Sequence, residues 1–105
     1  MTRIDRLPLT LGIHSTYKGY HYLVASLRIA LSDEQNLVYF TKRIFPKVAR
    51  MFNTTPYCVE RNIRTIIYVC WNSNNRQALQ DISPYELQEA PTVGEFLDIL
   101  YWNLK

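Results

Sequence analysis

Apolar residues recur along the chain at the three- and four-residue spacing of an amphipathic helix. The segment 19–31 places tyrosine, leucine, valine and alanine side chains at i, i+3, i+4 and i+7, which predicts a helix with one apolar face. The segment 35–45 repeats this pattern, and Pro46 is expected to end that helix and to open a short one over 47–52. Strand signals are weak throughout. The pattern therefore predicts an all-α protein with about six helices.

The middle of the chain predicts two helices joined by a tight polar turn. Asn53 and Thr54 form the turn, Thr55 is predicted to be the N-cap, and Pro56 occupies a favourable first helical position. The second helix is expected to run from 56 to about 71 and to end in the four polar residues 72–75. Helices near 46–52 and 56–71 in this order predict a helix-turn-helix, in which the first helix braces the second against the major groove.

The ends of the chain carry shorter or more obvious helix signals. A short helix is expected over 77–82, and the last one opens with Thr92 and Glu95, the spacing of a capping box. Near the N-terminus, Pro8 and Gly12 permit only a short helix.

Length and composition bound the class of protein. The 105 residues are 48% apolar and 20% charged, so we expect one packed domain covering 1–105. No apolar run approaches a membrane span and the start has no signal-peptide core, so we expect a cytoplasmic protein without a membrane partner. Cys58 and Cys70 would lie about 18 Å apart on one helix, which predicts two free thiols. We expect no metal site and no cofactor.

The charge is distributed unevenly. The chain has a net charge of +3, but the segment 42–64 holds six basic residues and one acidic residue, a net of +5. From Gln77 onward five acidic residues face one lysine, a net of −4. One end of the fold could therefore attract a polyanion while the other repels it. Charge alone is equally compatible with an ordinary solvated basic face.

The long helix has a polar face suited to DNA. Val59, Ile63, Ile66, Ile67 and Cys70 gather on one side, and Tyr57, Glu60, Arg61, Arg64 and Tyr68 gather on the other. Arginine can form two bonds to guanine, glutamate can accept from cytosine N4, and tyrosine can contact a phosphate or a thymine methyl. The flanking Lys42, Arg43, Lys47 and Arg50 are placed for phosphates. Helix spacing alone leaves another interpretation open, in which Glu60 and Arg64 are simply a surface ion pair.

Several short segments in fixed order resemble a known family. They are Lys18-Gly19-Tyr20, Tyr22-Leu23, Thr41-Lys42, Pro46, Ala49, Phe52-Asn53-Thr54-Thr55, Val59-Glu60-Arg61, Ile63-Arg64, Trp71, Pro91-Thr92 and Glu95-Phe96. Each fragment is weak, but the ordered set resembles the C-terminal effector domain of the sporulation-initiation response regulator of endospore-forming bacteria. The resemblance covers nearly the whole chain from about Gly12.

The resemblance implies a six-helix, all-α transcription-factor domain that sits on tandem DNA sites as a dimer. It places Tyr57, Cys58, Glu60, Arg61 and Arg64 where the family's recognition helix meets DNA. With Lys42, Arg43, Lys47 and Thr55 these residues form the predicted DNA-binding set.

Three departures from the family pattern affect what we expect. Cys58 stands where the family has a base-reading arginine, which would leave one base pair unread at about 1 to 3 kcal/mol of discrimination. Tyr57 replaces a small hydroxyl residue. The family's full-length proteins also carry a phosphorylatable receiver domain. These 105 residues could not house one, so phosphorylation control is expected to be absent unless the chain is a fragment.

Two functional hypotheses follow. The first is a sequence-specific transcriptional regulator that places the 56–71 helix in the major groove of double-stranded DNA. The second is an interaction module that dimerises with a full-length regulator and modulates it without reading DNA itself. An enzyme with a small-molecule substrate is not expected, because the chain has no paired carboxylates, nucleophile–base pair, phosphate loop or metal cluster.

Overall fold

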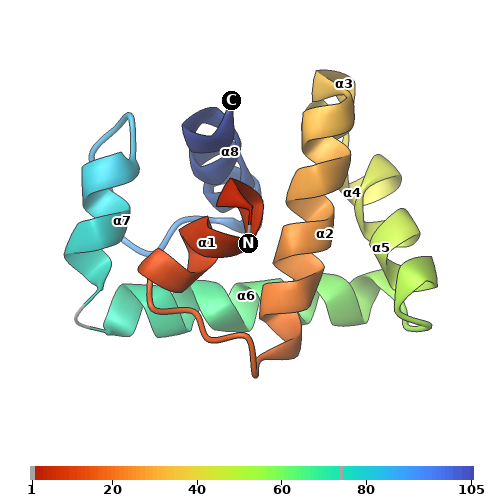
Figure 1. The fold of residues 1–105 in the computed structure, drawn as a ribbon, viewed down its shortest axis with the longest axis horizontal. Helices are drawn as coiled ribbons and strands as arrows, with labels where there is room; N and C mark the ends of the chain where they lie inside the picture. Colours follow the sequence, from red (N-terminus) through yellow and green to blue (C-terminus); the bar gives the residue numbers. More distant parts are fainter. Residues whose placement is uncertain (1, 74) are drawn as a thin grey trace.

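The computed structural model describes residues 2–73 and 75–105. Within these residues the secondary structure is helical, with no strand, and six of the helices have seven or more residues. The expected all-α class is therefore confirmed. The helices are α1 (Arg3–Thr10), α2 (Lys18–Ser32), α3 (Glu34–Val38), α4 (Phe40–Arg43), α5 (Phe45–Met51), α6 (Pro56–Asn72), α7 (Arg76–Ile82) and α8 (Val93–Leu104) (Figure 1).

α6 organises the fold. It runs across the molecule, with α2 and α8 crossing it and with α5 and α7 at its two ends (Figure 1). Its inward side chains are all buried, and they are the five that the periodicity predicted: Val59, Ile63, Ile66, Ile67 and Cys70. Burial of such side chains from α2, α6 and α8 supplies most of the driving force for folding.

A glycine allows α2 to approach α6 closely. A Cβ atom added at Gly19 would overlap the backbone carbonyl oxygen of Asn62 and lie 2.7 Å from Cγ2 of Ile66. Real Cβ atoms do not come this close, so the first turn of α2 can touch the backbone of α6 only because residue 19 has no side chain. This contact fixes where α2 begins relative to the middle of α6.

The predicted single helix over 35–45 is wrong. The backbone leaves the helical region at Tyr39, where φ is −110° and ψ is 42°, and the segment divides into α3 and α4. Packing explains the break. The Asn36 side chain donates to the carbonyl of Ile29 at 3.0 Å, while Phe40 lies against Gly94 of α8 and makes an edge-to-face contact with Phe45. These tertiary contacts override the helical pattern.

Pro46 does not end a helix as expected. α5 already begins at Phe45, so the proline occupies its first turn, where a missing N–H costs no hydrogen bond. The short helix expected over 47–52 is thus shifted towards the N-terminus and covers Phe45–Met51.

The other predicted boundaries lie close to those observed. Thr92 and Glu95 form the expected capping box, with N–H···O distances of 3.1 Å and 2.9 Å. The helix predicted over 77–82 is α7, and α6 ends at Asn72. The four residues expected to end α6 include Asn74, which lies outside the described residues.

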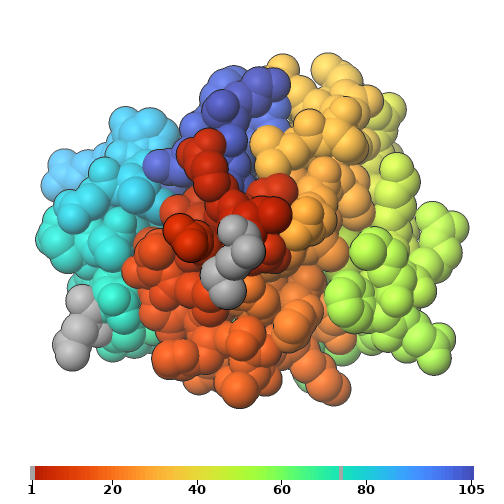
Figure 2. All heavy atoms as spheres, in the orientation of Figure 1, coloured from red at the N-terminus to blue at the C-terminus, as the bar shows by residue number. Residues whose placement is uncertain are grey.

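α1 closes the bundle over the end of α8. The Arg3 guanidinium donates to the carbonyl oxygens of Asn103 and Leu104 at 2.6 Å and 3.4 Å. In the space-filling view, α1, the loop after it and α2 cover α6 on this side of the molecule (Figure 2).

No helix in the described part of the chain is long and apolar enough to span a bilayer.

Candidate nucleic-acid interface

α5, the turn and α6 form the predicted helix-turn-helix, and local hydrogen bonds hold the turn. Asn53 adopts a left-handed conformation with φ of 53°, and the N–H of Thr54 donates to the carbonyl of Ala49 at 2.8 Å. This is the helix-ending motif that favours glycine or asparagine at the residue after the cap. Thr55 then starts α6 by accepting the N–H of Cys58 on its hydroxyl at 3.1 Å. The predicted N-cap is confirmed.

The outward face of α6 is polar and accessible. The Tyr57 side chain is 70% exposed and that of Tyr68 is 53% exposed, and Arg61 and Arg64 between them are exposed as well. We call Tyr57, Arg61, Arg64 and Tyr68 the outer stripe. Because the opposite side of the same helix is buried, the core orients these four side chains towards solvent.

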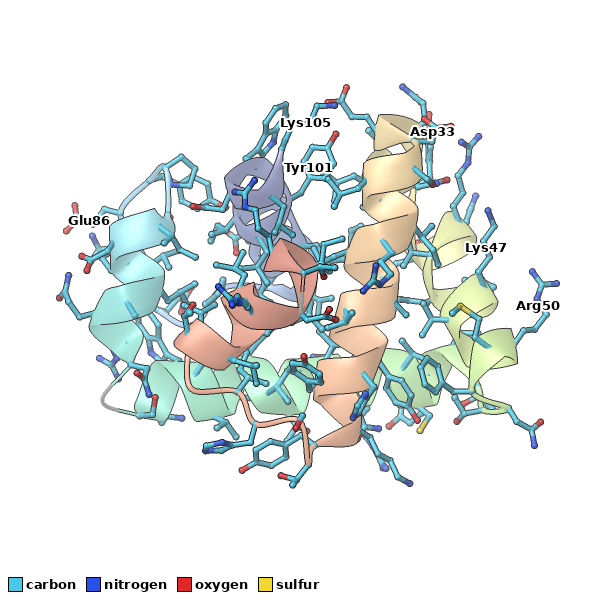
Figure 3. The ribbon with its side chains drawn as sticks, in the orientation of Figure 1. Asp33, Lys47, Arg50, Glu86, Tyr101 and Lys105 are labelled. Carbon is cyan, nitrogen blue, oxygen red and sulfur yellow. The ribbon has the colours of Figure 1, made fainter. Side chains whose placement is uncertain are left out.

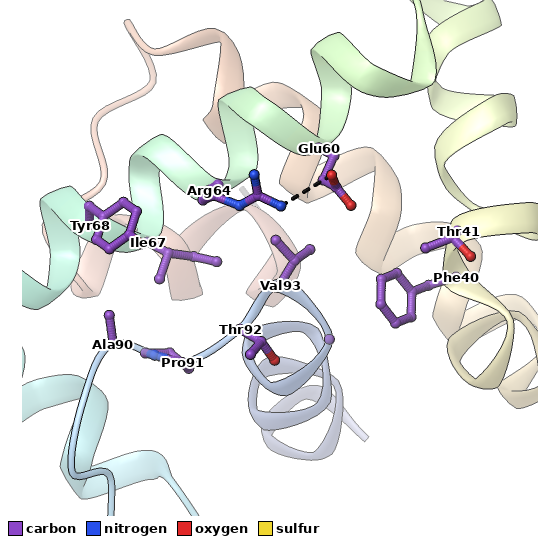
Figure 4. A pocket seen from close by; sticks show the side chains of 11 residues that line it. Phe40, Thr41, Glu60, Arg64, Ile67, Tyr68, Ala90, Pro91, Thr92 and Val93 are labelled. Carbon is purple, nitrogen blue, oxygen red and sulfur yellow. Dashed lines mark hydrogen bonds and ion pairs between the residues drawn. The ribbon is translucent and has the colours of Figure 1, made fainter.

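Glu60 and Arg64 are paired. The Arg64 guanidinium donates to a carboxylate oxygen of Glu60 at 3.1 Å, so the surface ion pair raised as an alternative is present. Both side chains line a cleft of about 470 Å³ between α6, α4 and the residues 90–94 that lead into α8 (Figure 4). An exposed pair of this kind stabilises a helix by only a few tenths of a kcal/mol, so Arg64 can exchange this partner for another acceptor at little cost.

Cys58 lies at the edge of α6 next to α2. Its side chain is half-buried, and the Asn62 amide donates to the Cys58 carbonyl at 2.8 Å and to its Sγ at 3.4 Å. Burial raises the pKa of the neighbouring Tyr22, and proximity to Cys58 adds to this effect. The thiol is therefore held against the protein. Cys58 and the buried Cys70 are both free, as expected.

The flanking basic residues lie on α4 and α5. Lys42, Arg43, Lys47 and Arg50 are all exposed, and the Arg43 guanidinium lies 5.3 Å from the centre of the Tyr39 ring. Lys47 and Arg50 project outward from α5, at the edge of the molecule (Figure 3). Glu86 lies at the opposite edge, beyond α7 (Figure 3). Glu86 is thus well separated from the basic edge, which can orient the approach to a polyanion, whereas Glu95 and Asp98 line a pocket together with Leu37, Val38 and Phe40 of α3 and α4.

The cleft contains residues that sequence reasoning missed. Pro91, Thr92 and Val93 line the same cleft as Arg64, although more than 25 positions separate them from it in the chain (Figure 4). The capping-box signal located the start of α8 but carried no information about which helix it would face.

A helix-turn-helix whose second helix has a buried apolar face and an accessible Arg/Tyr face defines a class of protein, the DNA-binding domains of transcription regulators. The chain matches the family model described as "Sporulation initiation factor Spo0A C terminal" over residues 4–104. It belongs to this family, which confirms the resemblance seen in the sequence. The family's domain is the DNA-binding effector domain of that factor, so the chain is a DNA-binding domain of transcription regulation in sporulation. The family is not an enzymatic one.

Proposed function

We propose that residues 1–105 act as one sequence-specific DNA-binding domain with α6 as the recognition helix in the major groove. The observation that carries this proposal is the outer stripe, which presents two arginines on a helix whose opposite face is fixed in the core. Arg61 is the principal base reader because its guanidinium can form two parallel bonds to guanine. Arg64 and Glu60 contact the adjacent bases once their ion pair opens.

The remaining members of the predicted set have supporting roles. Tyr57, in the first turn of α6, packs on a sugar or a thymine methyl, and Thr55 fixes the start of the helix. Lys42, Arg43 and Lys47 contact phosphates, which position the domain without reading sequence. Cys58 is too short to read a base and is already held by Asn62, so one base pair of the family's site is left unread.

We further propose that two copies bind tandem sites as a head-to-tail homodimer. The basic edge formed by α4 and α5 and the acidic edge beyond α7 are complementary in charge and lie at opposite ends of the molecule (Figure 3). The longest dimension of the Cα trace, 33 Å, is close to the roughly 34 Å of one DNA turn, so adjacent copies could occupy the same face of the duplex. The DNA-binding role also implies that the domain acts in the cytoplasm.

The test is a titration into labelled duplexes followed by fluorescence anisotropy at several salt concentrations. One duplex carries the family's tandem recognition boxes and the other a scrambled sequence. We expect binding that weakens linearly in log salt and favours the family duplex. Arg61→Ala should remove about 1 to 3 kcal/mol of that preference. Arg6→Ala, which deletes the same charge from the exposed surface of α1, should leave the preference unchanged.

Two outcomes would redirect the proposal. Equal, salt-sensitive binding to both duplexes would mean that the domain grips DNA but reads a different site. No binding to either duplex at low salt would refute it and leave the interaction module as the working hypothesis. Cys58→Arg sharpens the test, because restoring the longer side chain should increase the preference for the family duplex by about 1 to 3 kcal/mol.

A further inference from the structure

A loop that sequence analysis left without a role runs beside α6. Residues 11–17 connect α1 to α2, and the loop is fixed at its start by the fully buried Leu11 and Ile13. At its end, Gly19 packs directly on the backbone of α6 at Asn62. The loop and the first turn of α2 therefore lie along one flank of α6 (Figure 1). The cleft lined by α4 and residues 90–94 lies along the other flank (Figure 4).

The outer stripe lies between the flank of α6 that contacts α2 and the flank that lines the cleft. Asn62 and Ile66 face α2, whereas Glu60, Arg64 and Ile67 line the cleft. At 100° per residue, Arg61 points between these directions, away from the core.

The loop surface is polar and free of acidic residues. His14, Ser15, Thr16, Tyr17 and Lys18 are all exposed. The loop is held by a hydrogen bond of 2.8 Å between His21 Nε2 and the Ser15 carbonyl and by stacking of His14 on Tyr17. The sequence from 6 to 32 contains no aspartate or glutamate, so no neighbour along the chain neutralises Lys18.

We infer that Lys18 and the loop before it form a second phosphate-binding edge, which contacts the DNA strand on the α2 side of the recognition helix. The inference rests on the proposed function and deepens it. A helix with its side chains is about 10 to 12 Å wide and the major groove is about 12 Å wide, so a helix lying in the groove brings both of its flanks against the sugar–phosphate backbones. On the α2 flank, the exposed cation next to the groove is Lys18. The Lys18-Gly19 pair thus has two roles: glycine brings α2 against α6, and lysine contacts the phosphate.

The experiment compares Lys18→Ala with Lys105→Ala, which deletes the same charge at the end of the molecule opposite α6 (Figure 3). Affinity for the family and scrambled duplexes is measured by anisotropy across a salt series. For Lys18→Ala we expect a similar loss of about two- to fivefold on both duplexes at low salt. The slope of log affinity against log salt should fall by about 0.9, the value for one phosphate contact. Lys18→Arg should retain the wild-type slope, and Lys105→Ala should not change it.

A second measurement needs no variant. Lysine acetylation of the wild-type protein, followed by mass spectrometry, should show slower modification of Lys18 when DNA is bound and an unchanged rate at Lys105. The inference is overturned if wild-type protein binds DNA while Lys18→Ala leaves the slope unchanged or Lys18 stays unprotected. If wild-type protein binds neither duplex, the proposed function fails and this inference fails with it. An effect confined to the family duplex would also overturn the phosphate role, because phosphates carry no sequence.

Discussion

The inward and outward faces of α6 are built from the same 17 residues and differ in what constrains them. The inward face is a run of buried aliphatic side chains packed against α2 and α8, and its task is stability. The outward face is an exposed Arg/Tyr stripe with a single ion pair at its edge, and it adds little to stability. Residues on the outward face can therefore change while the inward face maintains the fold. Tyr57 is such a change relative to the family pattern, and Cys58, at the edge of α6 next to α2, is a second departure from it.

The largest expected effect breaks the inward face. Ile63 is fully buried, so Ile63→Ala should lower the free energy of unfolding by about 2 to 5 kcal/mol through lost burial and a residual cavity. Urea denaturation followed by circular dichroism measures this. Arg61→Ala, two positions earlier on the outward face, should stay within about 0.5 kcal/mol of wild type. Similar losses of unfolding free energy in the two variants would show that both faces contribute equally to stability.

Alkaline pH should weaken the inward face through Cys70. Burial raises the pKa of this thiol from 9.0 to about 11, so the folded protein keeps it neutral after the unfolded chain has begun to ionise. Stability is unaffected below pH 9 and should fall between pH 9 and 11, by roughly 2 to 3 kcal/mol at most. Burial also raises the pKa values of Tyr20 and Tyr22, which act in the same direction.

The control for this effect is Cys70→Ala, which keeps the tyrosines and removes the thiol. Urea unfolding at pH 8 and pH 10.5 should show a smaller alkaline loss in Cys70→Ala than in wild type. Ile63→Val, which removes a buried methyl group but leaves the thiol and the tyrosines in place, should show the same alkaline loss as wild type. Identical pH dependence in all three proteins would contradict the assignment to Cys70.

Thr55, at the start of α6, is the N-cap of the helix and belongs to the predicted DNA-binding set. Two substitutions at this position can separate its effect on stability from its effect on DNA affinity. Thr55→Ala should destabilise the protein by about 1 kcal/mol, because the N–H of Cys58 loses its capping acceptor. Thr55→Asp should keep the cap and the stability, yet weaken DNA binding because it adds a negative charge at the interface. Denaturation and anisotropy on the same two variants test this. Unchanged DNA affinity in Thr55→Asp would place Thr55 away from the phosphates.

The smallest expected change in stability concerns the outward ion pair. Glu60→Gln should cost no more than about 0.5 kcal/mol, because an exposed pair four positions apart on a helix contributes little. Affinity for scrambled DNA should rise, since Arg64 is released and one negative charge is removed. A matched Glu86→Gln variant, on the opposite edge, controls for net charge. A fall in affinity for scrambled DNA would mean that Glu60 positions Arg64 for binding.

Much of the candidate site follows from local pattern. Periodicity separated Ile63 from Arg61 and Arg64, and the order of Thr55 and Pro56 located the first turn of α6. The same reasoning did not show that Cys58 is held by Asn62 or that Arg64 lines a cleft. Nor did it give Lys18 a place beside α6, because that place depends on a glycine contact between two helices.

The amino-acid sequence was enough to define α2 from its strong apolar period, α6 and α8 from period and capping residues together, and the turn before α6. These features depend on residues within a few positions of one another, and their energetics are local. The break at Tyr39, the cleft beside Arg64 and the contact of Gly19 with Asn62 emerged only once whole helices packed together. Each of them depends on contacts between distant segments, and close packing rather than local preference selects among the arrangements that the helices could adopt.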